Sequence, residues 1–84
     1  MSGSSTADYF IDITALVCPM TFVRTKLAVE RLSPGQTLEV RLSPGEPLVN
    51  VPRALVEQGH AVLALAPERP DAPEGPHRLL VRAG

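Results

Sequence analysis

The sequence predicts a small α+β domain, a two-layer α/β sandwich, and three observations support this fold class. The chain has 84 residues, which is enough for one domain and too few for two. Segments typical of strands and of helices follow one another in the order β-α-β-α-β-β. Within residues 37–42, apolar Leu38, Val40 and Leu42 alternate with two charged residues, so one face of their sheet meets water and helices cover the other.

The composition indicates a folded domain whose interior is aliphatic. Hydrophobic residues make up 44% of the chain, charged residues 20% and aromatic residues only 4%, so Val, Leu and Ala must fill the core. The formal net charge is −1, and the basic residues are dispersed without interleaved aromatic residues. This charge pattern disfavours direct binding of nucleic acid.

We expect neither a membrane segment nor a signal peptide in this sequence. No apolar run approaches the roughly 20 residues that a membrane-spanning helix needs, and the first residues lack a basic start followed by an apolar stretch. We therefore expect a cytoplasmic, monomeric protein without a membrane partner. Residues 1–7 are expected to form a flexible tail, and residues 8–84 the single domain.

The first strand is predicted over Tyr9–Ile13, where β-branched and aromatic residues cluster. A loop then leads to Cys18 and Pro19. Proline is favoured in the first turn of a helix, where its missing N–H has no partner to lose. A helix is therefore predicted to begin at about Pro19 and to end near Leu32.

The first helix is predicted to bury one side, on which four residues recur with helical spacing: Phe22, Thr25, Val29 and Leu32, with Ala28 beside them. A thinner apolar stripe, Met20, Val23 and Leu27, follows the opposite side beside Arg24. Isolated surface apolar residues are common and need no explanation. The functional alternative is that these four residues form a strip on which a partner protein docks.

The second strand is predicted over Thr37–Leu42, with its apolar residues inward. After a turn, leucine and valine recur with helical spacing up to Gln58, and Gly59 suits the C-terminal cap. Pro52 must lie in the first turn of this helix or bend a longer helix that begins near Pro47. The longer helix is preferred.

The last two strands are predicted over residues 61–65 and 78–82. Residues 67–76 between them contain four prolines and several charged residues. Such a stretch is long for a hairpin connection and is expected to form a mobile loop.

Cys18 is the only cysteine in the chain, so it can form no internal disulfide. With two histidines and one cysteine the chain cannot assemble a zinc site of usual spacing, and no metal or cofactor is expected. The start of a helix stabilises a thiolate, which is the reactive nucleophile. The alternative is that Cys18 is a buried small hydrophobe, as free cysteines often are.

No basic residue is well spaced to activate this thiol. His60 follows the second helix and His77 follows the proline-rich loop, and both are interpreted as surface residues. Lys26 lies eight residues after Cys18, about 12 Å along a helix that rises ~1.5 Å per residue. It is therefore too far away to pair with the thiolate, and is interpreted as a solvated or docking charge.

The pattern of Asp12, then Cys18-Pro19, then Lys26, followed by Ser33–Gln36 before an alternating strand, resembles the TusA/SirA family of small sulfur-carrier proteins. The likeness runs from about Tyr9 to the end of the last strand. In that family an acidic residue precedes a Cys-Pro-x-Pro motif at the start of the first helix. The resemblance implies a four-stranded mixed sheet with two helices on one face.

The resemblance also implies a function and a set of site residues. Cys18 is expected to take a sulfane sulfur as a persulfide and to pass it to another protein. Pro19 is expected to start the helix, and Asp12 and Lys26 to have structural or partner-binding roles. The implied partners are a sulfur donor, such as a cysteine desulfurase or a rhodanese-like protein, and a downstream acceptor protein.

The chain departs from the family pattern at two positions. Ala15 stands where the family often has glycine, so the loop before the cysteine is expected to follow a different path. Thr21 replaces the second proline of the motif and lacks its fixed φ, which is expected to loosen the helix start.

Two other functions remain open alongside sulfur transfer. The chain could be a non-catalytic regulatory or interaction module that uses the exposed stripe of the first helix. It could also be a redox-sensing thiol protein, because an accessible thiolate is readily oxidised. Since the chain has no second cysteine, such a sensor would need a resolving thiol from glutathione or a partner.

Overall fold

A computed structural model describes residues 7–16 and 20–84 of the chain. Apart from Ala7, the predicted tail lies outside these residues. The elements follow the predicted order: β1 (Tyr9–Asp12), α1 (Met20–Glu30), β2 (Thr37–Leu42), α2 (Glu46–Glu57), β3 (Ala61–Pro67) and β4 (His77–Arg82).

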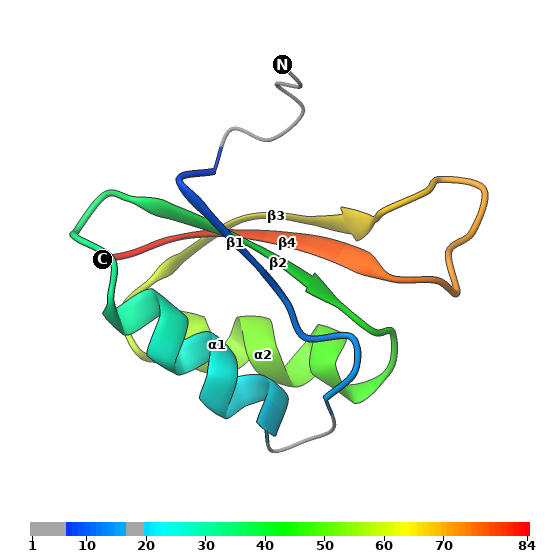
Figure 1. Cartoon of the computed structure of the whole chain (residues 1–84), viewed down its shortest axis with the longest axis horizontal. Coiled ribbons are helices and arrows are strands. Elements are labelled where there is room, and N and C mark those ends of the chain that lie inside the picture. The colour runs from blue at the N-terminus through cyan, green and yellow to red at the C-terminus, as the bar shows by residue number, and fades with distance from the viewer. Residues whose placement is uncertain (1–6, 17–19) are drawn as a thin grey trace.

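The four strands form one mixed sheet in the order β1-β2-β4-β3, and this sheet lies above the two helices in Figure 1. β1 runs parallel to β2, whereas β4 is antiparallel to both of its neighbours. Parallel neighbours need a crossover connection, and α1 supplies it. β1 and β3 are therefore the two edges of the sheet.

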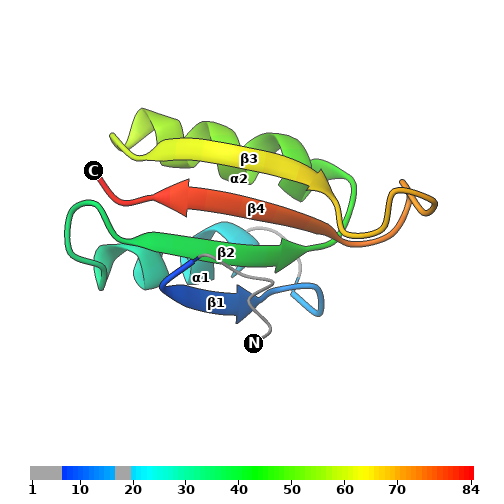
Figure 2. The same ribbon diagram turned by 90° about the horizontal axis from the view of Figure 1, so that it is seen from above.

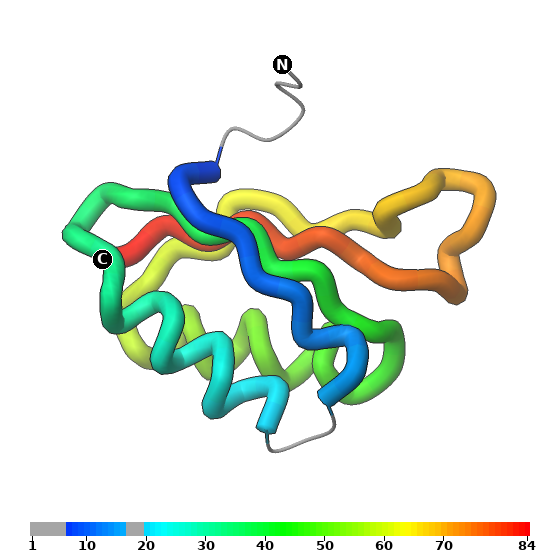
Figure 3. Tube along the Cα trace, in the orientation of Figure 1, coloured from blue at the N-terminus to red at the C-terminus, as the bar shows by residue number. Residues whose placement is uncertain are grey.

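Both helices lie on one side of the sheet, α1 beneath β1 and β2 and α2 beneath β3 and β4 (Figure 2). The predicted two-layer sandwich is confirmed. The connection between β3 and β4 projects beyond the helical layer at the opposite end of the molecule from the C-terminus (Figure 3).

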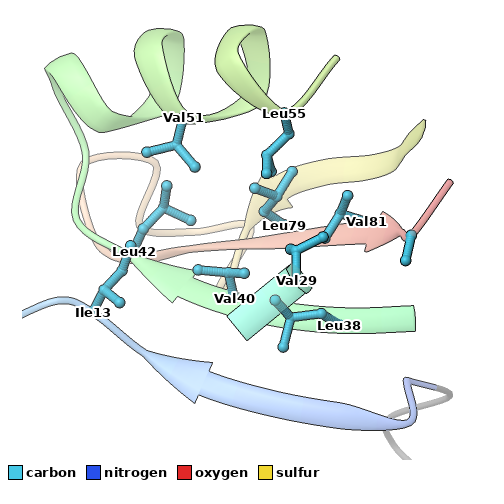
Figure 4. Close-up of a cluster of buried hydrophobic side chains, with 10 residues drawn as sticks. Ile13, Val29, Leu38, Val40, Leu42, Val51, Leu55, Leu79 and Val81 are labelled. Carbon is cyan, nitrogen blue, oxygen red and sulfur yellow. The ribbon is translucent and has the colours of Figure 1, made fainter. Parts of the chain in front are cut away.

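The hydrophobic core lies between the sheet and the helices, and its side chains point toward one another from every layer (Figure 4). β2 contributes three buried residues from one face, as its alternation predicted. None of the buried core residues is aromatic, in keeping with the composition. The members are Ile13, Val29, Leu38, Val40, Leu42, Val51, Leu55, Leu79, Val81 and Ala83.

The buried face of α1 differs in part from the prediction. Thr21, Thr25 and Val29 are buried, whereas Phe22 is only half-buried. The prediction is confirmed for Thr25 and Val29 and wrong for Phe22, because Thr21 takes the buried position at the start of the helix. The Thr25 hydroxyl donates to the Thr21 carbonyl oxygen at 2.8 Å, and this local bond to the preceding turn lets a β-branched threonine pack like valine.

α2 takes the longer of its two predicted forms, because Pro52 lies well inside the helix. Proline at this position cannot donate to the carbonyl of Leu48, and burial of Val51 and Leu55 against the sheet offsets this loss. Gly59 ends the helix with φ of 93°, a left-handed geometry that glycine adopts without strain. The predicted glycine cap is confirmed.

The β3–β4 hairpin extends further than the sequence predicted. β3 reaches Pro67, which pairs with His77 in register, and a bulge interrupts the pairing between Val62 and Ala64. Proline is tolerated here because β3 is an edge strand. The connecting loop therefore begins at Glu68, and its predicted mobility stays a prediction.

In the part of the chain that the structure describes, no helix combines the length and apolar character required to cross a membrane.

Core packing can be tested with one buried and one exposed leucine, each on a helix. Leu55 of α2 is 0% exposed and Leu27 of α1 is 53% exposed. Leu55→Ala is expected to lower the free energy of unfolding by about 2–5 kcal/mol because it leaves a cavity. Leu27→Ala is expected to change it by less than about 0.5 kcal/mol. Urea unfolding followed by circular dichroism measures both, and equal losses would contradict this description of the core.

Candidate functional site

Asp12 ends β1, and its carboxylate organises the turn that follows. The backbone N–H and the hydroxyl of Thr14 donate to Asp12 Oδ1 at 2.9 and 2.7 Å. The Leu16 N–H donates to the Ile13 carbonyl oxygen at 3.0 Å. An aspartate that holds the backbone two residues ahead forms an Asx turn. In the sequence, this turn leads directly to the segment that contains Cys18.

The turn is formed without a left-handed residue. Among the described residues, every positive φ belongs to glycine, so Ala15 accommodates the turn without strain from its Cβ. The Ser43 hydroxyl donates to the Thr14 carbonyl oxygen at 2.9 Å, which ties the turn to the loop after β2. How this path compares with that of a glycine-containing loop stays a prediction.

Cys18 and Pro19 lie outside the described residues, as does Val17. The first described residue of α1 is Met20, two positions after the cysteine in the sequence. Thr21 follows it and is 1% exposed. Burial of Thr21 fixes the first turn of α1 to the core, and whether the lost proline loosens the helix start stays a prediction.

A chain of ion pairs crosses the sheet on the side away from the helices. Arg41 of β2 meets Asp12 Oδ2 at 3.1 Å and Glu68 Oε1 at 2.6 Å. Arg78 of β4 meets the same Glu68 oxygen at 2.9 Å and Glu39 Oε1 at 3.1 Å. The network links the turn after β1 to the start of the β3–β4 loop.

These contacts shift the pKa values of two carboxyl groups. The pKa of Asp12 is lowered, first by the hydrogen bonds from Thr14 and then by the Arg41 guanidinium. The pKa of Glu68 is lowered by hydrogen bonds from Arg41 and Arg78. Hydrogen bonds and cations favour the charged form of a carboxyl group, so both carboxylates stay ionised at neutral pH.

Sequence reasoning selected Asp12 but missed its partner Arg41. It also missed Glu68 and Arg78, which extend the network beyond Arg41. The alternation of the strand predicted that Arg41 faces outward. Its pairing with Asp12 depends on the register of β1 against β2, which sets these two residues opposite each other. Glu68 joins them only because the β3–β4 hairpin extends as far as it does.

The four residues of the candidate docking strip are exposed on α1. Met20 is 50% exposed, Val23 38% and Leu27 53%, and Arg24 is exposed beside them. Lys26 forms an exposed ion pair with Glu30, Nζ to Oε2 at 3.4 Å. Such pairs along a helix contribute only about 0.3–0.5 kcal/mol to stability, so Glu30 holds the Lys26 side chain only weakly.

Two hollows border these elements. One, of about 640 Å³, runs between β1 and α1 and is lined by Tyr9, Phe10, Ile11, Arg24, Leu27, Ala28, Arg31 and Leu38. The other, of about 350 Å³, lies beside the Asp12 turn and is lined by Thr14, Ala15, Leu16, Ser43, Pro44, Glu46 and Pro47. The sequence did not identify the contributions of Tyr9, Phe10 and Arg31, because they depend on the packing of α1 beside β1.

The histidines have local partners within the described structure. His77 Nδ1 lies 3.0 Å from the Gly75 carbonyl oxygen, and the Gly84 N–H donates to His60 Nδ1 at 3.1 Å. Within residues 7–16 and 20–84, no three His, Cys, Asp or Glu side chains gather as metal ligands do.

The Asp12 contacts predict a pH dependence of stability. A carboxyl whose pKa is lowered by folding stabilises the fold fully above its unfolded pKa, near 3.8, and progressively less as the pH falls through the folded value. The stability that Asp12→Asn loses relative to wild type is therefore expected to be largest at pH 6–7 and to shrink below pH 4. Urea unfolding across this range measures the difference.

Asp71→Asn is the control for removal of one negative charge. Asp71 lies in the β3–β4 loop, 3.7 Å from the exposed Arg69. At pH 7 the Asp71→Asn variant is expected to lose less free energy of unfolding than the Asp12→Asn variant. A loss with Asp12→Asn that is the same at pH 7 and pH 3 would contradict the proposed role of the ionised carboxylate.

Comparison with known proteins agrees with this architecture. The family profile described as "Sulfurtransferase TusA" matches residues 9–82. A "Putative sulfur carrier protein" of Archaeoglobus fulgidus is 37% identical over 59 residues, which cover 70% of this chain and 67% of the relative. A protein of Thermotoga maritima with the same description is 33% identical over 55 residues, which cover 66% of this chain and 70% of that relative.

The crystal structure of a SirA-like protein from Desulfitobacterium hafniense has the same fold. The TM-score is 0.74 at 21% sequence identity, over 90% of this chain and 97% of that one. The family profile spans all six helices and strands described above. The chain therefore belongs to the TusA sulfurtransferase family.

Proposed function

We propose that this protein is a sulfur carrier in which Cys18 accepts a sulfane sulfur as a persulfide and passes it to a partner protein. Membership of the TusA family and the description of the two relatives as sulfur carriers support the carrier role. The structural observation that favours Cys18 is the Asp12-anchored turn, which precedes the only cysteine of the chain in the sequence.

The proposed reaction is two successive exchanges at sulfur. The Cys18 thiolate attacks the terminal sulfur of a donor persulfide, a Cys18–sulfur bond forms, and the donor's S–S bond breaks to release a donor thiolate. An acceptor thiolate then attacks the terminal sulfur carried by Cys18. A new S–S bond forms on the acceptor, and the Cys18 sulfur is released as a thiolate. Each step exchanges one S–S bond for another, so no external oxidant or reductant is needed.

This chemistry requires a thiolate and a docked partner, and it requires no general base on the carrier. Cys18 precedes the first described residue of α1 by two positions, and the N-terminal end of a helix favours negative charge. The histidines have local structural contacts, and the mechanism assigns them no part.

The docking surface is proposed to be the strip formed by Met20, Val23, Arg24 and Leu27 on α1. Its apolar residues are exposed in the turns that follow Cys18, where a partner that presents its own cysteine would contact the carrier. The proposed partners are a donor of the cysteine desulfurase or rhodanese-like class and an acceptor protein. We propose that the carrier acts as a monomer in the cytoplasm.

Exposure of the same strip favours a second candidate function, a regulatory module that binds partners without sulfur chemistry. The two functions differ in their dependence on the thiol. If the module is regulatory, loss of Cys18 is silent in cells while Val23→Asp or Leu27→Asp removes the phenotype.

Sulfur loading is the direct test of the carrier function. The purified protein is incubated with a cysteine desulfurase and cysteine and examined by intact mass under non-reducing conditions. Wild type is expected to gain one sulfur atom that a reductant removes, and Cys18→Ser is expected to gain none. Absence of sulfur on wild type, or equal gain on Cys18→Ser, would exclude a persulfide on Cys18.

The docking strip is tested by placing a charge in it. Val23→Asp and Leu27→Asp are each expected to slow sulfur transfer from the desulfurase about tenfold, because an apolar contact of roughly 1.4 kcal/mol is lost. Val49→Asp is the matched control, since Val49 lies on α2 and is 56% exposed. Transfer rates are followed by mass spectrometry, and an equal effect of Val49→Asp would show that the strip has no special role.

A further inference from the structure

The groove between β1 and α1 exposes the edge of the sheet. β1 pairs only with β2 in the described sheet, and Tyr9, Phe10 and Ile11 all line the groove. Successive side chains of a strand point to opposite faces, so three consecutive residues line one hollow only if the backbone edge forms part of its wall. An edge strand offers its unpaired N–H and C=O groups to an added strand.

The other wall of the groove combines apolar and cationic groups. Leu27 lies between Arg24 of α1 and Arg31, the first residue after α1, and all three are exposed. The structure gives no hydrogen bond or ion pair to either guanidinium among the described residues, whereas Arg41 and Arg78 each contact two carboxylates. The wall is therefore complementary to a ligand that carries negative charge on both sides of an apolar group.

The spacing of this wall fits an extended segment. Arg31 directly follows the last residue of α1, so at a helical rise of ~1.5 Å per residue it lies about 10 Å from Arg24 along the helix axis. Side chains i and i+4 on one face of a strand are about 13 Å apart, a difference that flexible arginine and glutamate side chains can span. A strand with acidic, apolar and acidic residues at i, i+2 and i+4 therefore matches Arg24, Leu27 and Arg31.

A second copy of this chain would not supply those carboxylates. The acidic residues before and at the end of β1 are already engaged, because Asp8 Oδ2 accepts from the Thr37 N–H at 2.9 Å and Asp12 accepts from Thr14 and Arg41. β1–β1 pairing would therefore leave Arg24 and Arg31 without anionic partners. This argument favours a different protein as the occupant.

We propose that the β1–α1 groove binds an extended acidic segment of a partner protein, which adds to the sheet as a strand beside β1 and sets its carboxylates against Arg24 and Arg31. This surface shares Arg24 and Leu27 with the proposed docking strip, but binding to it does not depend on the Cys18 thiol. It goes beyond the proposed function, because the segment can bind whether or not the cysteine carries sulfur.

The probe is the capped peptide Thr-Glu-Thr-Leu-Thr-Glu-Thr, whose glutamates and leucine share one face and whose threonines favour a strand. It is titrated into the ¹⁵N-labelled full chain carrying Cys18→Ser, so that thiol chemistry plays no part. Shifts are expected at the amides of Tyr9, Phe10 and Ile11 and along α1, and they are expected to weaken as salt is raised. A peptide with lysine in place of glutamate is expected to give none.

Charge reversal tests the two arginines. Arg24→Glu and Arg31→Glu are each expected to weaken peptide binding about fivefold, and the double variant roughly tenfold or more, because attraction becomes repulsion at an exposed site. Arg53→Glu is the matched control, an exposed position on α2 outside the groove, and is expected to keep wild-type binding.

Several results would overturn the proposal. The acidic peptide could fail to bind, or the lysine peptide could bind as tightly as the acidic one. Arg53→Glu could weaken binding as much as Arg24→Glu or Arg31→Glu does, or the shifts could be confined to elements other than β1 and α1. Concentration-dependent shifts at β1 without peptide, together with a dimer in analytical ultracentrifugation, would show that a second copy occupies the edge. Since the protein carries Cys18→Ser, these results are independent of whether wild type accepts sulfur.

Discussion

The two-sided character of β2 is the constraint on which the rest of the structure depends. Its inward residues, Leu38, Val40 and Leu42, are buried in the core between the sheet and the two helices. Burial of this apolar area holds the sandwich together. Its outward Arg41 contacts Asp12 and Glu68. A slip of one residue in register would exchange the two faces, and both the core and the ion-pair network would be lost.

The candidate site follows from this arrangement. The register of β1 against β2 brings Asp12 opposite Arg41, and the same carboxylate holds Thr14 in the turn that leads to the cysteine segment. The acidic residue that the family pattern places before the cysteine therefore has a defined structural contact. Its carboxylate therefore links Arg41 of the central strand to the turn that precedes the proposed nucleophile in the sequence.

Partner recognition is the other requirement of a carrier, and the exposed side of α1 offers two kinds of contact. Met20 and Val23 are the exposed apolar residues of the docking strip that lie nearest the cysteine in sequence. Arg24, Leu27 and Arg31 face the groove beside the free edge of β1. An open apolar edge favours association, and its short length and flanking arginines restrict the segments that can pair with it.

The sequence by itself determined the element order, the inward face of β2, the glycine end of α2 and the family pattern of Asp12 and Cys18, because periodicity and motif spacing are local properties. Only the tertiary structure decided that Thr21 is buried while Phe22 is only half-buried, that Asp12 pairs with Arg41, and that Phe10 and Arg31 share a groove. These features depend on strand register and on the packing of α1 beside β1, which bring together residues far apart in the chain. No pattern within one segment encodes that proximity.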